Sequence, residues 1–418
     1  MSPKVQDSAV VFTLFYPYST FDYYVDIEIE MICSIFKKVY IIPISIEKTI
    51  ERRLPNNAEL IESRFTASPF NALLQAILSG NYWSEISLAI KHKKLNKDLF
   101  KHLTLQHAKV NFLKQLLLRR LKLDANITWV YSHWLLEGVY AASQIKEKYN
   151  FQLISKAHSL DIYKERHINE YIPFLENAVP KLDQIHFISD LGKQYFNQNY
   201  QFKIPNHKQF VSRLGIQNQM PLKNFTPKDV LKIISVSYIY PLKRVDLILE
   251  AIAQIDDFSI EWHHIGAYYE NHTQNIKQKA KELLKHKPNI NVVWLGDYSI
   301  PQVYDYYEKN EFDLFVSASS SEGIPVSMME CMSFGIPVLS TNVGGVKEIV
   351  EDKINGFMVN ANPNSIEISD TIKKYQAMSN DDKINMRQKA YQKWKTIYNA
   401  ETNFKKFLNI AIPSKNDE

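Results

Sequence analysis

Cysteine, glycine and long apolar runs are all scarce in this chain of 418 residues. Its two cysteines, Cys33 and Cys331, lie far apart, which excludes a disulfide framework and a cysteine-based zinc site and suits a reducing compartment. The best candidate for a membrane-spanning helix, Ser8 to Phe21, has only 14 uncharged residues and contains Pro17, whereas such a helix needs ~20. The amino terminus shows no apolar run behind a basic cap, the pattern of a secretory signal. We therefore expect a soluble, cytoplasmic protein.

Positive charge is concentrated in one segment. The formal net charge is +5, but Lys91–Lys122 carries ten lysines and arginines against one acid, so this segment is +9 and the remainder −4. Leucines at helical spacing run through it, which predicts basic amphipathic helices. Such helices suit an anionic membrane surface, but two surface helices packed on a domain core would give the same pattern. Nucleic acid is not expected, because no aromatic-interleaved signature accompanies the charge.

Short apolar segments alternate with stretches of helical periodicity along the chain. This alternation, together with their β-branched content, predicts parallel strands in βαβ units. The first series comprises 10–15, 39–44, 127–131, 151–154 and 184–189, and the second comprises 231–237, 260–265, 291–295, 312–317 and 337–340.

A polar stretch at 218–228, which contains two prolines, separates the two series. The sequence therefore predicts an α/β protein with two Rossmann-like, doubly wound parallel-sheet domains facing a central cleft. We assign residues 1–220 to the first domain, with a helical basic insertion at about 50–125, and residues 221–395 to the second. Residues 396–418 are expected to form a helix that packs back on the first domain.

Five of the eleven glycines fall between Gly323 and Gly356. A chain otherwise poor in glycine needs positive φ or close backbone approach where it clusters them. A buried strand at 312–317 leads through a Ser/Gly loop into a helix that Pro325 starts and Gly335 ends. The N-terminus of that helix presents unpaired N–H groups and a partial positive charge, which together predict an anion site.

Two glutamates flank the predicted anion site. Glu330 lies about 8 Å along the helix from Pro325 at 1.5 Å per residue. A diphosphate at the helix start would leave an attached ribose near that depth, where a carboxylate can accept hydrogen bonds from two hydroxyls. Glu322, in the loop before the helix, would face the other end of the same ligand. Burial of Glu330 among apolar neighbours without a partner would be costly, which favours a ligand role.

The segment from Glu322 to Glu348 resembles the signature of glycosyltransferase family 4, E-x7-E, within the wider pattern (S)EG-x-P-x-x-x-x-E-x-M-x-x-G-x-P-V-(T)-x-x-G-G-x-x-E. VSYIYPLKRVDLILEAI at 236–252 resembles the family's phosphate-binding strand, loop and helix, and SKAHSLDIY at 155–163 its histidine-bearing strand end. FYPYSTFDYYVDIEIEMI near the start is similar to members that build bacterial surface polysaccharides. The resemblance covers most of the chain except residues 50–125.

The resemblance implies a GT-B fold, retention of anomeric configuration, and a nucleotide-sugar donor bound mainly by the second domain. It implies that Glu330 holds the ribose, that Glu322 holds the donor-sugar hydroxyls, and that His158 contacts the donor sugar across the cleft. Lys243 and the helix start would bind the diphosphate. The helix-start candidates are Gly323, Pro325, Val326 and Ser327. Tyr298, just after a strand, is a candidate for stacking on the base.

The sequence departs from the family pattern at two places. Tyr238 stands where the family often has an arginine, and we hypothesise that Arg244, directly after Lys243, supplies the missing charge. The glycine usual in the first loop is replaced near Phe21 and Asp22, so the acceptor-side loop is not assigned.

The chain lacks D-x-D, the usual metal–diphosphate signature of the other large glycosyltransferase fold. Fixed positive groups aimed at the departing diphosphate can stabilise the transition state instead. We therefore predict no metal and no other cofactor. In a retaining displacement the departing diphosphate can itself take the proton of the acceptor.

These observations predict a hexosyltransferase that moves a sugar from a UDP-linked donor, rather than a GDP-linked one, to a glycan. The acceptor is expected to be lipid-linked, because the basic segment lies in the acceptor-side half. Two alternatives stay open. A nucleotide-sugar epimerase of the same fold would have no use for a membrane-facing segment, and a non-catalytic partner subunit would be expected to lose its charged ligands. A dehydrogenase is disfavoured, because no G-x-G-x-x-G follows the first strand of either domain.

Overall fold

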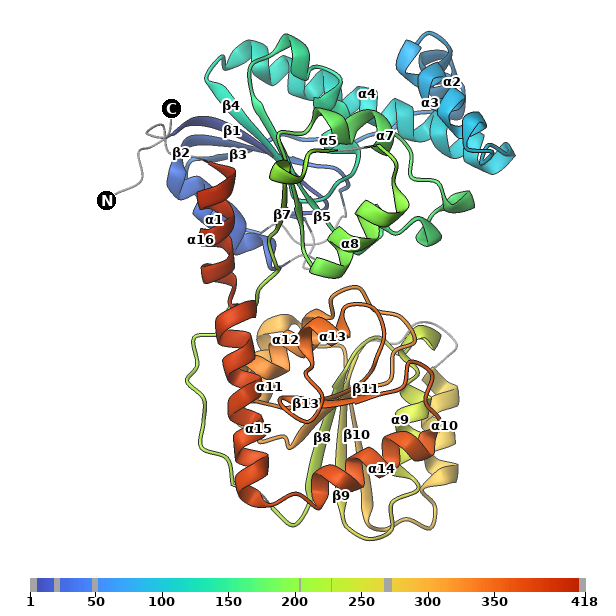
Figure 1. Ribbon diagram of the computed structural model, residues 1–418, viewed down its shortest axis with the longest axis vertical. Coiled ribbons are helices and arrows are strands. Elements are labelled where there is room, and N and C mark those ends of the chain that lie inside the picture. Colours follow the sequence, from blue (N-terminus) through green and yellow to red (C-terminus); the bar gives the residue numbers. More distant parts are fainter. Residues whose placement is uncertain are drawn as a thin grey trace. The chain divides into compact units, whose positions relative to one another are not determined.

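The chain divides into two compact units, each an α/β domain built on a parallel sheet (Figure 1). The computed structural model describes residues 6–18, 23–46, 52–202, 204–226, 228–266 and 273–412, without the side chains of 273–275. The first unit is Met1–Leu214 with Glu401–Glu418, and the second is Gly215–Ala400. The division falls slightly before the polar stretch at 218–228. Phe21 and Asp22 lie outside the described residues.

In the described part of the first unit, seven parallel strands pair in the order β3-β2-β1-β4-β5-β6-β7. They are β1 (Gln6–Thr13), β2 (Phe36–Pro43), β3 (Ala58–Leu60), β4 (Ile127–Ser132), β5 (Gln152–Ala157), β6 (Gln184–Phe187) and β7 (Gln209–Val211). The five predicted strands are confirmed, whereas the short edge strands β3 and β7 were not predicted. The strand order reverses between β1 and β4, which makes their carboxyl ends a topological switch point.

Three helices of the first unit begin after a polar residue whose side chain accepts a backbone N–H. Ser68 caps α2, Asn96 caps α4 and Ser189 caps α8 in this way. The α-helices are α1 (Val25–Ile35), α2 (Pro69–Ile77), α3 (Gly80–Lys91), α4 (Lys97–Leu123), α5 (Glu137–Ser143), α6 (Ser159–Ile162), α7 (Leu175–Ala178), α8 (Asp190–Asn199) and α16 (Ala400–Ala411).

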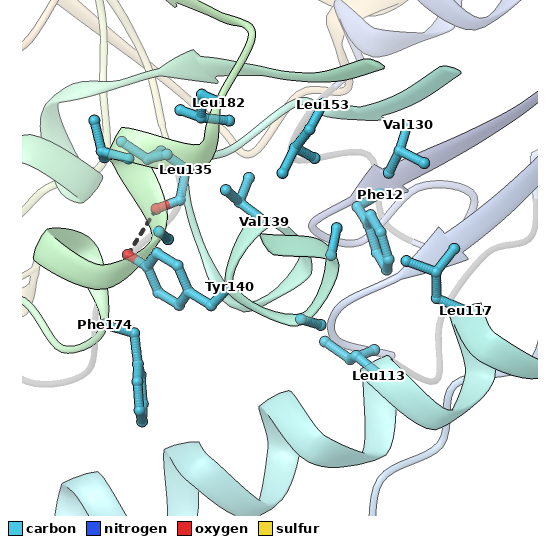
Figure 2. Close-up of a cluster of buried hydrophobic side chains, with 14 of the residues drawn as sticks. Phe12, Leu113, Leu117, Val130, Leu135, Val139, Tyr140, Leu153, Phe174 and Leu182 are labelled. Carbon is cyan, nitrogen blue, oxygen red and sulfur yellow. Dashed lines mark hydrogen bonds between the residues drawn. The ribbon is translucent and has the colours of Figure 1, made fainter. Parts of the chain in front are cut away.

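Figure 2 shows a buried apolar cluster that joins β1, β4 and β5 to α4 and α5. Its members include Phe12, Leu113, Leu117, Val130, Val139, Tyr140 and Leu153. Helix α5 approaches β1 closely because Gly138 has no side chain: a Cβ there would lie 2.5 Å from Cγ of Phe12. The Tyr140 hydroxyl donates to the Leu135 carbonyl at 3.0 Å, which satisfies its polar end inside the core.

The apolar face of the long helix α4 is buried throughout. Val110, Leu113, Leu117 and Leu121 belong to this core, whereas Leu99 and Leu103 belong to a separate small cluster with residues of α3. Two of its basic residues are paired, because Lys109 lies 3.0 Å from Glu137 and Arg120 lies 3.1 Å from Glu59. The apolar face of α4 is therefore packed inside the unit and is not available to a membrane, whereas membrane contact by the rest of the basic segment stays a prediction.

The C-terminal helix α16 belongs to the first unit, although its chain arrives from the second. Phe404, Phe407 and Leu408 pack in a buried cluster with residues of β1, β4 and α1. The Ala411 carbonyl accepts a hydrogen bond from Trp129 Nε1 at 3.3 Å.

In the described part of the second unit, six parallel strands pair in the order β10-β9-β8-β11-β12-β13. They are β8 (Leu231–Val236), β9 (Ile260–Ile265), β10 (Ile290–Gly296), β11 (Leu314–Ser317), β12 (Val338–Thr341) and β13 (Gly356–Val359). The five predicted strands are confirmed, and only β13 was not predicted. The order reverses between β8 and β11, so the switch point of this unit lies at their carboxyl ends.

Helices follow most of these strands (Figure 1). They are α9 (Val245–Ile252), α10 (Thr273–Leu283), α11 (Ile300–Lys309), α12 (Val326–Ser333), α13 (Val346–Ile349), α14 (Ser365–Gln376) and α15 (Asn380–Lys393), the last continued by a π-helical turn at Trp394–Tyr398. Gly335 has φ +72° just after α12, which confirms the predicted C-terminal cap.

Candidate active site

Lys243 and Glu322 meet at the switch point of the second unit. Lys243 ends a short 3-10 turn, Pro241–Lys243, that follows β8, and Glu322 lies in the loop that follows β11. The Lys243 ammonium lies 2.7 Å from Glu322 Oε1, with the two side chains 25% and 11% exposed. The loops also meet through their backbones, because the Ser320 N–H donates to the Leu242 carbonyl at 2.8 Å. Lys243 and Glu322, which come from two separate sequence motifs, are thus in direct contact.

The loop that carries Glu322 is supported by the glycine pair Gly344–Gly345. The Gly345 N–H donates to the Gly323 carbonyl at 2.8 Å. A Cβ on Gly344 would lie 1.9 Å from the Glu322 carbonyl oxygen, and one on Gly345 would lie 2.3 Å from that of Gly323. Gly344 also has φ +49°, in the left-handed region. The glycines that cluster in the sequence therefore allow two loops to touch directly.

Helix α12 begins directly after this loop. Pro325 precedes it with an extended backbone (φ −74°, ψ 109°), and no side chain caps its first turn. Val326 and Ser327, the first two helical residues, are half-buried and start an N-terminus of the kind that binds anions. Glu330 lies one turn further on and is only 3% exposed, among the buried Met328, Met329 and Met332 of the same helix. A carboxylate is thus buried one turn beyond the predicted phosphate position.

Arg244 is held by backbone and amide oxygens. It starts α9 in the left-handed conformation, φ 45° and ψ 45°. Its guanidinium donates to the carbonyls of Ala318 at 2.5 Å, Ser319 at 3.1 Å and Ala361 at 3.0 Å, and to Asn362 Oδ1 at 2.8 Å. These contacts join the loops that follow β8, β11 and β13. They favour a positioning role for Arg244 over direct contact with a phosphate.

Tyr298 follows Gly296, which ends β10 at φ +76°. Its ring lies edge-on to that of Tyr306, with centroids 5.8 Å apart. The Tyr306 hydroxyl is in turn 2.5 Å from His263 Nδ1. The structure thus shows Tyr298 packed on a neighbouring aromatic ring, and stacking on a nucleotide base stays a prediction.

Sequence reasoning missed Gly266, at which the turn after β9 packs against the turn after β8. A Cβ on this residue would lie 1.7 Å from the Ser237 carbonyl oxygen, so the turns after β8 and β9 need glycine to touch. The Gly266 N–H donates to the Gly296 carbonyl at 2.8 Å. An isolated glycine directly after the apolar run 260–265 was the available signal.

His158 lies in the first unit, at the end of β5 and before the short helix α6. It is 3% exposed and stacks on Trp134, with centroids 4.0 Å apart and planes 20° apart. Burial is the main cause that holds the pKa of His158 well below its usual value, and the neighbouring His133 and Lys156 lower it further. The ring is therefore neutral. Because a carbonyl only accepts, Nε2–H donates to the His133 carbonyl at 2.9 Å and Nδ1 keeps its lone pair.

Asp161 fixes the loop around this histidine, a role that sequence reasoning did not assign. Its two carboxylate oxygens accept the backbone N–H groups of His158 and Leu135, each at 2.6 Å. These bonds join the ends of β4 and β5. Aspartate three residues into a helix start, as in SKAHSLDIY, is the sequence signal for such a cap.

A second buried polar group of the first unit was also missed. Glu28 of α1 pairs with Lys156 of β5, and its other oxygen lies 2.6 Å from His133 Nδ1. The Lys156 ammonium also lies over the rings of Phe404 and Phe407, 4.9 and 4.8 Å from their centroids. This network ties α1 and α16 to the sheet. Its partners are too distant in sequence for any local pattern to reveal.

The sequence is similar to glycosyltransferases in comparisons with known proteins. Residues 217–394, nearly all of the second unit, match the family model for glycosyl transferases group 1. Escherichia coli WcaL, provisionally named as a glycosyltransferase of colanic acid biosynthesis, is 27% identical over 221 residues, which are 49% of this chain and 50% of WcaL. The O-antigen biosynthesis glycosyltransferase WbnH of Escherichia coli is 26% identical over 251 residues, 60% of this chain and 68% of WbnH.

A solved structure matches over nearly the whole chain. Anabaena Alr3699/HepE in complex with UDP and glucose has a TM-score of 0.61 and 13% identity, and the match covers 96% of this chain and 98% of that one. With the two parallel-sheet units, this likeness confirms the expected GT-B fold. The fold and the sequence matches together support a glycosyltransferase. Within the described ranges, no helix combines the length and hydropathy that crossing a bilayer requires.

Proposed function

We propose that this protein is a retaining glycosyltransferase of family 4, which transfers a hexose from a UDP-sugar to a glycan acceptor in the synthesis of a bacterial surface polysaccharide. The observation that carries the proposal is the contact of Lys243 with Glu322 beside the N-terminus of α12. It brings a cation, a carboxylate and open helix N–H groups to the switch point of a doubly wound sheet. The match of residues 217–394 to group 1 glycosyltransferases supports the same conclusion.

The chemistry follows from what the reaction must stabilise. Breaking the sugar–phosphate bond leaves negative charge on the diphosphate and positive character on the sugar. We assign the diphosphate to Lys243 and to the backbone between Gly323 and Ser327. Glu330 then accepts hydrogen bonds from the ribose hydroxyls, and Glu322 from the hydroxyls of the transferred sugar. The contact of His158 with the donor sugar stays a prediction from the family resemblance. Arg244 holds the loops in place.

One feature of the free protein suits this assignment. Lys243 is paired with Glu322, so the site keeps no isolated charge before the donor arrives. The diphosphate would compete with Glu322 for the ammonium and release the carboxylate toward the sugar. The departing diphosphate takes the acceptor proton in this scheme, and the reaction needs no metal. The colanic acid and O-antigen biosynthesis in which WcaL and WbnH are named supports a polysaccharide acceptor, and the UDP complex of HepE supports a uridine donor.

A donor panel tests the proposal. The full chain is incubated with UDP-sugars and GDP-sugars, with and without a bacterial lipid extract, while nucleotide release and sugar identity are followed by NMR. We expect one UDP-sugar to release UDP only when an acceptor is present, and the new linkage to keep the anomeric configuration of the donor. Glu330→Gln should abolish most of this release, whereas the exposed Glu282→Gln, in the same unit, should not.

Other results would contradict the proposal. Interconversion of the donor without an acceptor would assign an epimerase. Binding of no nucleotide sugar would favour a non-catalytic subunit. Inversion at the anomeric carbon would contradict the retaining mechanism but would still identify the protein as a glycosyltransferase.

A further inference from the structure

Helices α2 and α3 carry an unusual exposed apolar surface, which we call the α2–α3 face. It consists of Phe70, Leu74 and Ile77 of α2, of Leu78 directly after α2, and of Trp83 and Ile90 of α3. Phe70 is 69% exposed and Leu78 is 87% exposed. In Figure 1 these two helices project beyond the N-terminal half of α4, away from the sheet of their own unit.

Helical geometry places these side chains together. Residues 70, 74, 77 and 78 follow the spacing of one helix face, as do Trp83 and Ile90, two turns apart on α3. Trp83 Nε1 donates to the Ile77 carbonyl at 2.9 Å, which brings the indole to the end of α2. The exposed side chains of α2 therefore share one helix face, and Trp83 joins α3 to its end.

The opposite side of α3 is firmly attached, so the exposed side chains are not a displaced core. Buried Glu85 accepts hydrogen bonds from the Tyr171 hydroxyl at 2.6 Å and the Phe174 N–H at 2.8 Å. The Tyr82 hydroxyl lies 2.9 Å from Thr104 Oγ1 of α4. Ala76, Tyr82, Ile86, Ala89, Leu99 and Leu103 form a small buried cluster of their own. Helices α2 and α3 and the start of α4 thus share a small core of their own, and the α2–α3 face still remains exposed.

Exposed lysines follow Ile90 closely in the chain. Lys91, Lys93, Lys97 and Lys101 are exposed, and none of the four forms an ion pair with any residue that the structure describes. The neighbouring His92 and Lys94 pair with Glu176 and Glu170. Asp98 is the only acid between Lys91 and Lys122. An apolar face thus ends in a group of unpaired positive charges.

We propose that the α2–α3 face, with Lys91, Lys93, Lys97 and Lys101, binds the surface of an anionic lipid bilayer. The apolar side chains enter the boundary between headgroups and acyl chains, and the lysines contact lipid phosphates. This assigns the apolar part of the membrane contact to α2 and α3, because α4 buries its own apolar face and offers only Lys97 and Lys101 of its first turns. The surface places the transferase beside a lipid-linked acceptor, and it goes beyond the proposed activity.

A second copy of the chain fits this surface less well. An isologous contact would bring the four lysines of both copies into one interface that supplies no matching group of acids from this segment. An anionic bilayer supplies both the apolar phase and the opposite charge. Charge complementarity therefore favours lipid as the occupant.

Vesicle flotation tests this assignment and needs no donor or acceptor, so it can fail independently of the proposed transferase activity. The full chain is mixed with phosphatidylcholine vesicles that either contain or lack phosphatidylglycerol. Flotation is expected with the anionic vesicles and should fall with added salt. Leu74→Ser/Leu78→Ser should lower the partition coefficient at least about tenfold. Lys97→Gln/Lys101→Gln should lower it roughly 25-fold.

Matched controls use the far end of α4. Arg119→Gln/Lys122→Gln removes the same charge, and Leu123→Ser removes an exposed leucine, so both should keep the partition coefficient within about twofold. Trp83 supplies a direct probe: brominated lipids should quench the fluorescence of the wild type more than that of Trp83→Phe. Circular dichroism melting checks that each variant is folded.

Three results would overturn the proposal. The first is absence of flotation with anionic vesicles by the folded wild type. The second is equal flotation by wild type, Leu74→Ser/Leu78→Ser and Lys97→Gln/Lys101→Gln. The third is a wild-type dimer that becomes monomeric in Leu74→Ser/Leu78→Ser without any lipid binding, which would assign the face to a second copy.

Discussion

The ammonium of Lys243 lies 2.7 Å from Oε1 of Glu322, although 79 residues separate them in the chain. The contact joins the loops that follow β8 and β11, the two strands between which the order of the second sheet reverses. It places the proposed phosphate ligand beside the proposed sugar ligand. The predictions below follow from this arrangement and from the packing that maintains it.

Replacement of Lys243 should mainly affect the chemical step. Lys243→Gln removes a fixed positive charge from the departing diphosphate, and we expect kcat/KM to fall about 10²-fold or more. Lys243→Arg should recover part of the loss, because the charge returns with a different geometry. Initial rates of UDP release measure the effect. The exposed Lys347→Gln is the control, and an equal loss in both variants would refute a specific role for Lys243.

Gly344→Ala should disturb the loop that carries Glu322. The new Cβ would lie 1.9 Å from the Glu322 carbonyl oxygen, at a residue with φ +49°. We expect a loss of about 1–3 kcal/mol in the free energy of unfolding and a marked fall in activity. Gly80→Ala is the matched control, since a Cβ at that residue would meet no other atom within 4 Å. Equal thermal midpoints for both variants would show that the close approach is not required.

Acid should destabilise the second unit in part through His264. Burial lowers the pKa of His264 to about 4, while its Nδ1 lies 2.8 Å from Ser235 Oγ. The unfolded chain, with a pKa of 6.5, therefore binds more protons than the native chain between these values. Stability is retained above pH 6.5 and is lost as pH falls toward 4, by about 2 kcal/mol at pH 5.

Urea titrations at pH 7 and pH 5 measure this loss. His264→Asn keeps a hydrogen-bonding group near Ser235 and removes the titration. The variant should lose about 2 kcal/mol less than the wild type on the same change of pH. An unchanged pH dependence would mean that other groups dominate acid unfolding.

Metal removal should leave transfer unaffected. The proposed site stabilises the diphosphate with Lys243 and the start of α12 rather than with a metal ion. Activity measured after EDTA treatment and gel filtration should stay within about twofold of the untreated enzyme. Loss of activity that Mg²⁺ or Mn²⁺ restores would contradict this prediction.

Much of the fold follows from local sequence patterns. Short, mainly apolar segments such as 10–15 and 231–237 form largely buried strands of parallel sheets, so their composition marks them as strands. The edge strands Ala58–Leu60, Gln209–Val211 and Gly356–Val359 have three or four residues each, too few for a clear pattern. Their presence depends on pairing with a sheet that already exists.

The candidate site was only partly predictable. The spacing of Glu322, Pro325 and Glu330 lies within one loop and helix, where local geometry determines relative positions. The contacts of Arg244 depend on carbonyls 74 to 117 residues away, so its positioning role appears only in three dimensions. The pairing of Glu28 with Lys156 spans 128 residues and is hidden for the same reason.

Binding of UDP to the full chain, measured by isothermal titration calorimetry, tests the central claim most directly. The wild type should bind UDP. Glu330→Gln loses a charged acceptor for the ribose hydroxyls and should bind about 10- to 100-fold more weakly, while the control Glu282→Gln should match the wild type. Equal affinity of the folded Glu330→Gln and wild-type proteins for UDP would contradict the placement of the donor at α12.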